Sequence, residues 1–233
     1  MNTNKENNSL NKQIVYDLTK FSHLDFPDHL SCIVWFVGCN MRCDYCYNKD
    51  IVFTHKGKYT LEDILSFLEQ RVGLLDGVVL SGGEATSHNL ISFCQQVKSL
   101  GFKIKLDTNG TNYNNIKELI DLNLIDYVAL DYKAPEYKYY EITHSKAFAS
   151  FENTLIYLIQ SNIKFEVRTT VHNDLLNEMD INFIIHDLLN KGYENTYFLQ
   201  EFMDTEDNIG NISTPLKGFN KEMISKNLDV IYR

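Results

Sequence analysis

The chain has 233 residues, of which 44% are hydrophobic, and carries a formal net charge of −9. This length and composition suffice for one sizeable hydrophobic core, and the acidic balance argues against non-specific nucleic-acid binding, which relies on basic surfaces. No run of eighteen apolar residues occurs, so no membrane span is expected. Residues 1–12 are polar and Asn-rich, without the apolar stretch of a secretory signal. We expect them to form a disordered tail before a single cytoplasmic domain at 13–233.

Predicted strands and helices alternate along the chain. Strands are expected at residues 14–18, 32–37, 77–80, 103–107, 127–131, 164–171 and 195–201, with a last strand or helical turn at 228–231. Helices are expected from Thr60 as an N-cap, and at 87–100, 115–124, 150–160 and 177–191. The alternation indicates parallel βαβ units. Six main strands from 32 to 201 are too few for a closed eight-unit barrel, so the predicted α/β fold is a partial (β/α)6, TIM-like barrel or a strongly curved open sheet.

Three cysteines directly follow the predicted strand at 32–37. Cys39, Cys43 and Cys46 have the spacing Cys-x3-Cys-x2-Cys. A structural zinc site or an ordinary iron–sulfur cluster is closed by four ligands, whereas three thiolates on a four-iron cluster leave one iron open to a substrate. The chain has five cysteines, an odd number, and three lie in one short loop, which does not suit a disulfide framework.

Two other interpretations of this loop stay open on the residues alone. The cysteines could bind zinc with a fourth ligand, or remain reduced thiols without metal. The candidates for that fourth zinc ligand are Cys32, His23, His29 and His55.

Further polar groups follow the next strands. Gly82 and Gly83 allow a close backbone approach to a ligand, and Glu84 offers a carboxylate to an ammonium group; a plain glycine turn before a helix is the alternative. The segment Asp107-Thr108-Asn109-Gly110 is either a capped turn or a polar lip over a cofactor.

The later strands carry charged side chains at or near their ends. Asp131 and Lys133 point the same way from an extended chain, and a surface salt bridge is the alternative to a functional role. Arg168 lies within an apolar strand and needs a partner there. His172 ends the same strand, where a solvated or capping histidine is the alternative. Tyr47, directly after the last cysteine, is either a core aromatic or a cofactor contact.

The cysteine spacing together with Gly-Gly-Glu resembles the radical S-adenosylmethionine (SAM) enzymes. This resemblance implies that Cys39, Cys43 and Cys46 hold a [4Fe-4S] cluster whose open iron is chelated by SAM. It also implies that the segment Gly82-Gly83-Glu84 holds the methionine amino group of SAM and that Tyr47 packs on the adenine of SAM or lends it backbone contacts.

The segments Leu24-Asp25-Phe26-Pro27, Gly-Cys-Asn, Asp-Thr-Asn-Gly and Asp-x-Lys resemble the activating proteins of anaerobic ribonucleoside-triphosphate reductases. Val37 and Tyr47 depart mildly from the commoner forms of that family. The resemblance implies a SAM site that includes Asp107, Thr108, Asn109, Asp131, Lys133 and His172. If Arg168 points into the barrel, the carboxylate or the ribose hydroxyls of SAM are its natural partners there. The acidic residue Asp107 would also help to bind a monovalent cation there.

The same resemblance implies a function. An external donor of the flavodoxin or ferredoxin type would reduce the cluster, and SAM would be cleaved to methionine and a 5′-deoxyadenosyl radical. This radical would abstract hydrogen from a glycine of a partner, the anaerobic ribonucleoside-triphosphate reductase. The alternatives are the activase of another glycyl radical enzyme such as pyruvate formate-lyase, a small-molecule enzyme such as 7-carboxy-7-deazaguanine synthase, and a zinc-bearing binding module.

Overall fold

The computed structural model describes residues 10–205 and 207–233. The chain forms two compact units, which we describe separately. The first contains the described residues up to 40 together with 50–108 and 112–128, and the second contains 41–49, 109–111 and 129–233. Most of the predicted tail lies outside the described residues, and within its last three residues Leu10 is buried. The single-domain assignment stays a prediction.

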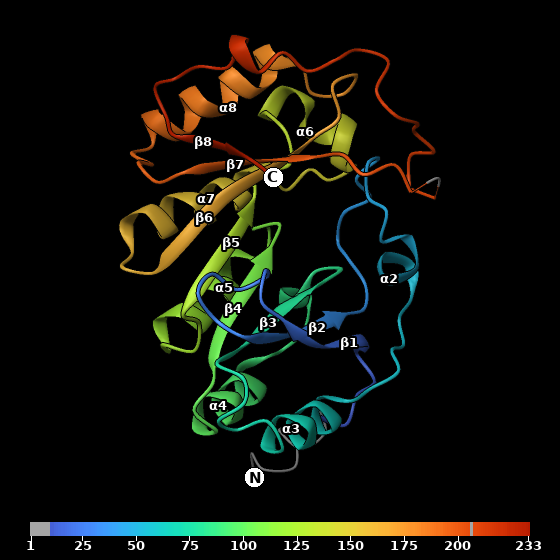
Figure 1. Cartoon of the computed structure of the whole chain (residues 1–233), viewed down its shortest axis with the longest axis vertical. Coiled ribbons are helices and arrows are strands. Elements are labelled where there is room, and N and C mark those ends of the chain that lie inside the picture. Colours follow the sequence, from blue (N-terminus) through green and yellow to red (C-terminus); the bar gives the residue numbers. More distant parts are fainter. Residues whose placement is uncertain (1–9, 206) are drawn as a thin grey trace. The chain divides into compact units, whose positions relative to one another are not determined.

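The first unit is built on four strands that pair in sequence order (Figure 1). They are β1 (Val15–Ser22), β2 (Ser31–Phe36), β3 (Gly77–Gly82) and β4 (Lys103–Thr108). β1 is antiparallel to β2, while β2, β3 and β4 run parallel. Phe36 pairs with Gly82, so the carboxyl ends of β2 and β3 lie side by side. This register brings the start of the cysteine loop next to the Gly-Gly-Glu segment.

The described part of the first unit contains five helices. They are α2 (Lys49–Phe53, whose first residue belongs to the second unit), α3 (Leu61–Glu69), the 3₁₀ helix η1 (Ala85–Ser87), α4 (Ile91–Ser99) and α5 (Tyr113–Asp121). A side chain caps the start of two of them, α3 and η1. Thr60 and Asp63 form a capping box at the start of α3, as the sequence predicted for Thr60. The prediction of one helix over 87–100 is wrong at its start. The Glu84 side chain accepts from the amide of Thr86 and favours a separate 3₁₀ turn, after which the chain is extended at His88.

The second unit continues the alternation of strands and helices. Its strands are the end of β5 (Tyr127–Asp131), β6 (Lys164–Val171), β7 (Tyr197–Glu201) and β8 (Val230–Tyr232), and β6, β7 and β8 pair in parallel. Its helices are α6 (Glu136–Thr143), α7 (Phe148–Gln160), α8 (Glu178–Asn190) and the 3₁₀ helix η2 (Lys221–Met223). The sequence predicted β5 and β6 with the observed bounds but not α6. The helix α6 buries aromatic and polar side chains such as Tyr139 and Thr143, so its sequence lacks a clear apolar period.

Each unit has its own buried apolar contacts. In the first unit Phe26, Ile33 and Val79 pack together at the strands. In the second, Tyr132 of the chain after β5 lies edge-on to Phe151 of α7, with ring centroids 4.7 Å apart. Within the described part of the chain, no helix has the length and apolarity that a membrane crossing requires.

Candidate functional site

The Gly-Gly-Glu segment is tied to the beginning of the cysteine loop within the first unit. The amide of Gly83 donates to Phe36 O at 2.9 Å, and the amide of Glu84 donates to Gly38 O at 2.8 Å. A Cβ atom on Gly83 would lie 1.9 Å from Gly38 O, so no other residue fits without a shift of the backbone. The glycine therefore serves the close approach of two chain segments, next to Cys39.

Glu84 is a buried carboxylate that hydroxyl groups hold at the ends of β3 and β4. Glu84 is only 1% exposed. The Oε1 atom accepts from the hydroxyls of Thr86 at 2.5 Å and Thr108 at 2.8 Å. A carboxylate oriented in this way is suited to accept from an ammonium group. The structure thus brings the predicted residues Glu84 and Thr108 together.

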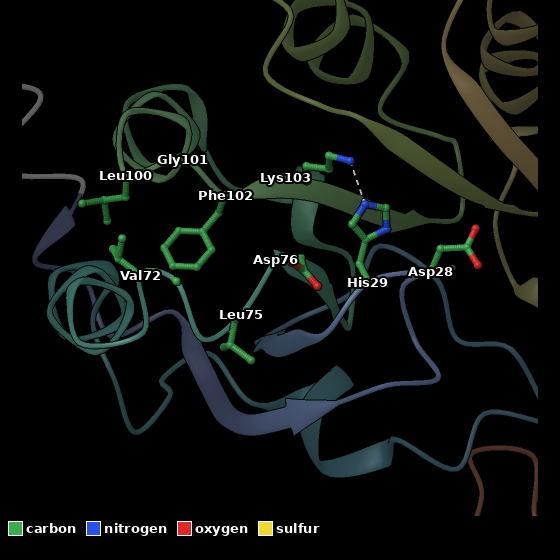
Figure 2. A pocket seen from close by; sticks show the side chains of 10 residues that line it. Asp28, His29, Val72, Leu75, Asp76, Leu100, Gly101, Phe102 and Lys103 are labelled. Atoms are coloured by element: carbon green, nitrogen blue, oxygen red, sulfur yellow. Dashed lines mark hydrogen bonds between the residues drawn. The ribbon is translucent and has the colours of Figure 1, made fainter.

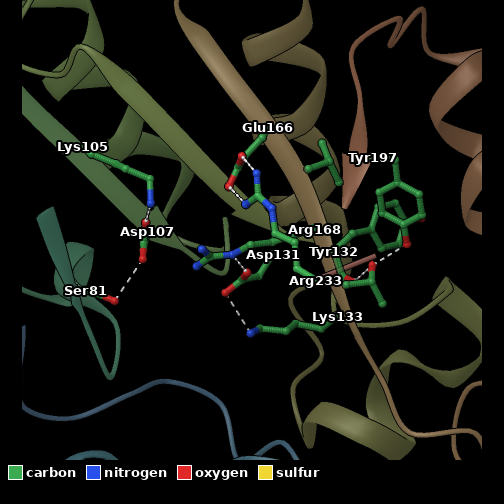
Figure 3. A network of polar contacts seen from close by, with 12 residues as sticks. Ser81, Lys105, Asp107, Asp131, Tyr132, Lys133, Glu166, Arg168, Tyr197 and Arg233 are labelled. Carbon is green, nitrogen blue, oxygen red and sulfur yellow. Dashed lines mark hydrogen bonds and ion pairs between the residues drawn. The ribbon is translucent and has the colours of Figure 1, made fainter. Parts of the chain in front are cut away.

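Asp107 pairs with groups that sequence reasoning missed. Its carboxylate accepts from Lys105 Nζ at 2.6 Å and from Ser81 Oγ at 3.2 Å (Figure 3). The Lys105 side chain is 3% exposed, so this is a buried ion pair. The i, i+2 spacing of Lys105 and Asp107 along a strand was the available signal. The monovalent cation beside Asp107 stays a prediction, and Lys105 already supplies a positive charge there.

Cys43 and Cys46 belong to the second unit. Cys43 is buried and Cys46 is half-buried, and the amide of Cys46 donates to Cys43 O at 2.9 Å. The amide of Asp44 donates to Ile142 O at 3.0 Å, at the end of α6. Tyr47, the predicted adenine contact, is 50% exposed, which excludes its alternative role as a core aromatic.

Tyr45 is the buried tyrosine of this loop, and sequence reasoning did not select it. It is 5% exposed, and its hydroxyl donates to Lys133 O at 3.4 Å. Burial raises the pKa of the Tyr45 hydroxyl well above its ordinary value, and the charges of Cys43 and Asp131 raise it further. The phenol therefore stays neutral. The only feature of the sequence that pointed to Tyr45 was its position between the predicted ligands Cys43 and Cys46.

Asp131, Lys133 and Arg168 form one network in the second unit (Figure 3). Asp131 accepts from Arg168 Nε at 2.5 Å and from Lys133 Nζ at 2.9 Å. The side chains of Asp131 and Lys133 are both 19% exposed, so the alternative of a surface salt bridge is wrong. The partner that Arg168 needs within its apolar strand is Asp131.

The ionisation of this network is set by burial and by its own charges. Burial alone would raise the pKa of Asp131, but the charges and hydrogen bonds of Arg168 and Lys133 outweigh it and lower the pKa to about 2. Burial opposes the charged form of Lys133, yet the charges of Asp131 and Cys43 raise its pKa. All three side chains are therefore charged at neutral pH. The network can present fixed cationic donors to a carboxylate or to ribose hydroxyls.

Asn109 and His172 have structural partners of their own. Asn109 Oδ1 accepts from the amide of Thr111 at 3.0 Å, which closes a turn after β4. His172 is 3% exposed, donates through Nε2 to Ser213 O at 2.7 Å, and packs edge-on against Phe202. The His172 Nδ1 atom is buried without a hydrogen-bond partner among the described residues. The alternative of a solvated His172 is thus wrong, and its contact with SAM stays a prediction.

The zinc interpretation finds little support in two of its candidate fourth ligands. Burial raises the pKa of Cys32 to about 12, which disfavours the thiolate. His29 lies at the amino end of β4, where Nε2 contacts Lys103 Nζ at 2.8 Å and Nδ1 contacts Pro27 O at 2.5 Å. A cavity of about 520 Å³ opens beside it and includes Asp76 in its lining (Figure 2). His29 lines this cavity, but none of the residues predicted to hold the cluster or SAM does.

The donor chemistry of the chain fits a [4Fe-4S] cluster and SAM. Five reduced thiols are present, and three of them share one short loop. The close contact between Gly83 and Gly38, which only a glycine allows, keeps the carboxylate of Glu84 next to the start of that loop. Among the described residues, no three His, Cys, Asp or Glu side chains already converge as a metal centre. Cys39, Cys43 and Cys46 are the residues that would hold the cluster.

Comparison with known proteins agrees with this chemistry. The profile of the Radical SAM superfamily matches residues 33–183. Over 177 residues the chain is 34% identical to a putative glycyl-radical enzyme activating enzyme of Methanocaldococcus jannaschii, covering 73% of each chain. It is also 31% identical over 113 residues to the pyruvate formate-lyase-activating enzyme of Clostridium pasteurianum, covering 46% of this chain and 47% of that protein.

A solved structure shows the same fold at lower identity. The native anSMEcpe protein with bound AdoMet superimposes with a TM-score of 0.58 at 19% identity, covering 72% of this chain and 49% of that one. The chain belongs to the radical SAM superfamily, and its predicted fold class, a partial (β/α)6 barrel, is confirmed. Within that superfamily it belongs with the glycyl-radical enzyme activating enzymes. It is a radical SAM oxidoreductase that uses a [4Fe-4S] cluster and SAM.

Proposed function

We propose that this protein generates a glycyl radical on an anaerobic ribonucleoside-triphosphate reductase. The observation that carries glycyl-radical activation is the 34% identity to a putative glycyl-radical enzyme activating enzyme over 73% of both chains. The Asp-Thr-Asn-Gly and Asp-x-Lys segments, which resemble those of the reductase activating proteins, support this choice of partner. The similarity to pyruvate formate-lyase-activating enzymes makes pyruvate formate-lyase the second candidate partner.

The chain's own residues support the chemistry by binding and orientation. When bound, the reduced cluster and SAM supply reductive cleavage of the sulfonium and the hydrogen abstraction that follows. Glu84, which the hydroxyls of Thr86 and Thr108 hold, would accept from the amino group of SAM. The charged network of Asp131, Lys133 and Arg168 would bind the carboxylate or the ribose hydroxyls of SAM. Glu84 is buried, the network is largely buried, and all of these groups are already paired, so they need little reorganisation when SAM binds.

Only one cluster is expected on this chain. The two cysteines outside the loop, Cys32 and Cys94, are buried, and burial raises the pKa of each thiol to about 12. Neither is suited to ligate metal. The reaction therefore needs an external electron donor, for which we propose a flavodoxin or ferredoxin.

The cluster assignment is tested by substituting cysteines inside and outside the loop. The protein is reconstituted anaerobically with iron and sulfide, and 5′-deoxyadenosine is measured after addition of dithionite and SAM. Cys43→Ala is expected to abolish SAM cleavage and to lower bound iron, because one of three thiolates is lost. Cys94→Ala is the matched control, since it removes a buried thiol far from the motif in sequence, and it should retain both. Full cleavage activity in Cys43→Ala would contradict the assignment.

The partner is tested by EPR spectroscopy. The active protein is mixed in parallel with an anaerobic ribonucleoside-triphosphate reductase and with a pyruvate formate-lyase from the same organism. A glycyl radical signal on the reductase alone is the expected result. A signal only on pyruvate formate-lyase would replace the proposed partner. SAM cleavage without a radical on either protein, but with turnover of 6-carboxytetrahydropterin, would favour 7-carboxy-7-deazaguanine synthase.

A further inference from the structure

The segment after β7 contacts the second half of the cysteine loop. The amide of Ile209 donates to Cys46 O at 3.0 Å, and the amide of Gly210 donates to Asp44 O at 2.9 Å. Nearby, Lys49 Nζ lies 3.1 Å from an Asp207 carboxylate oxygen. Two backbone hydrogen bonds thus join this segment to the predicted cluster ligand Cys46 and to Asp44, which directly follows the predicted ligand Cys43. No predicted site residue lies in this segment.

Asn208 builds the turn that presents these two amides. It is 1% exposed, its Oδ1 accepts from Ile212 N at 2.8 Å, and its Nδ2 donates to Ile212 O at 2.6 Å. Asn211, within this turn, has a φ of 50°, a left-handed conformation that asparagine tolerates better than most residues. A buried side chain bonded twice to one backbone position gives the turn a defined shape.

Gly210 is needed for the close approach of the turn to the loop. A Cβ atom at this position would lie 2.6 Å from Asp44 Cβ and 2.9 Å from Asp44 Cα. Real Cβ atoms do not approach other atoms this closely, and both atoms belong to or adjoin the backbone of the loop. Any side chain at 210 would therefore push the turn and the loop apart.

The same loop is fixed on its other flank by α6. The amides of Arg42 and Asp44 donate to Thr143 O at 2.9 Å and to Ile142 O at 3.0 Å. The carboxylate of Asp44 also contacts His144 Nε2 at 2.8 Å. The residues from Arg42 to Cys46 are thus held between the end of α6 and the turn.

The turn is itself anchored to the chain that follows β6. Ser213 O accepts from His172 Nε2 at 2.7 Å, and Gly218 O accepts from Asn173 Nδ2 at 2.7 Å. The amide of Leu216 donates to Asp174 Oδ2 at 2.8 Å. Three successive residues after β6 therefore hold the segment that holds the cysteine loop.

We propose that residues 207–213 form a clamp that sets the position of Cys43 and Cys46, with Gly210 and Asn208 as positioning residues for the cluster. The position of ligands and the access of solvent tune the properties of an iron–sulfur cluster. The clamp should therefore affect the cluster's reduction potential as well as the order of the loop. This inference rests on the cluster assignment and holds whichever protein receives the radical.

The first experiment measures hydrogen exchange on the protein without its cluster, so it is independent of activity. Gly210→Ala is compared with Gly218→Ala, which keeps the backbone carbonyl that Asn173 contacts. A Cβ at 218 meets no atom within 4 Å, and Gly218 does not have a positive φ. In Gly210→Ala, the amides of residues 209 and 210 are expected to exchange roughly tenfold faster, because the variant loses the net contribution of one or two hydrogen bonds. Amides of β3 serve as the reference for global unfolding. Gly218→Ala should exchange like the wild type.

The second experiment uses the reconstituted protein and records its reduction potential and the EPR spectrum of the reduced cluster. Gly210→Ala should shift both, and Gly218→Ala neither. Asn208→Asp, which keeps the acceptor for Ile212 N but loses the donor, should shift them in the same direction by less, and it carries the test if Gly210→Ala does not fold. Unchanged potential and spectrum in the folded variants would overturn the proposal. Faster exchange spread evenly over all amides, with an unaltered spectrum, would overturn it too.

Discussion

Replacing Asp131 by asparagine tests the charged network of the second unit. The substitution keeps the shape of the side chain and removes its charge, so Arg168 and Lys133 lose the group that neutralises them. The pKa of Asp131 falls from an ordinary 3.8 to about 2. At about 1.4 kcal/mol per pKa unit, this corresponds to about 2 kcal/mol of stabilisation of the charged form. The substitution also leaves two cations together at a largely buried site. Breaking a buried pair costs about 3–5 kcal/mol in total, so the full loss exceeds the value derived from the pKa alone.

We therefore expect Asp131→Asn to lower the free energy of unfolding by about 3 kcal/mol at pH 7. Urea unfolding of the cluster-free protein, followed by circular dichroism, measures this difference. Asp121→Asn is the matched control, because Asp121 pairs with Lys117 on the exposed face of α5, where the two side chains are 51% and 40% exposed. Exposed pairs contribute little, so the urea midpoint of this control should stay close to that of the wild type.

The pH dependence of the same variant gives a second, signed test. The folded pKa of Asp131 lies below its unfolded value, so its stabilising contribution is complete above the unfolded pKa and is lost as the pH falls toward the folded one. The difference between wild type and Asp131→Asn should shrink from about pH 4 to about pH 2. An equal urea midpoint at pH 7, or a difference that does not change with pH, would refute the role of this network.

Two further predictions concern backbone geometry and helix capping. Gly83→Ala should lower bound iron after reconstitution and destabilise the cluster-free protein by at least about 2 kcal/mol, because the new Cβ would collide with Gly38 O. Metal analysis measures the bound iron, and urea unfolding measures the stability. Stability equal to that of Gly218→Ala would contradict the prediction. Thr60→Ala should cost about 1 kcal/mol through loss of the α3 cap. SAM cleavage per bound cluster should stay the same in that variant, and a loss of cleavage without a loss of stability would speak against a purely capping role.

The alternation of strands and helices was predictable because it depends on local periodicity. The strands β5 and β6 have the predicted bounds, and the capping residue Thr60 was identified from its side-chain chemistry. The start of α4 was not predictable, because the Glu84 side chain bonds to the backbone of its own loop and separates a short 3₁₀ turn from the helix. The helix α6 was missed because aromatic packing rather than apolar spacing buries it.

The sequence by itself determined which chemistry this protein performs. Three closely spaced cysteines, a Gly-Gly-Glu segment and polar residues at strand ends predict the donors for a cluster and for SAM, since donor type and spacing can be read directly from the chain. Tertiary structure decided what those residues touch. Arg168 is neutralised by Asp131, and Gly210 approaches Asp44 across more than 160 positions of the chain. Such contacts depend on how strands pair and how the segment after β7 returns to the cysteine loop, and no local pattern of residues specifies them.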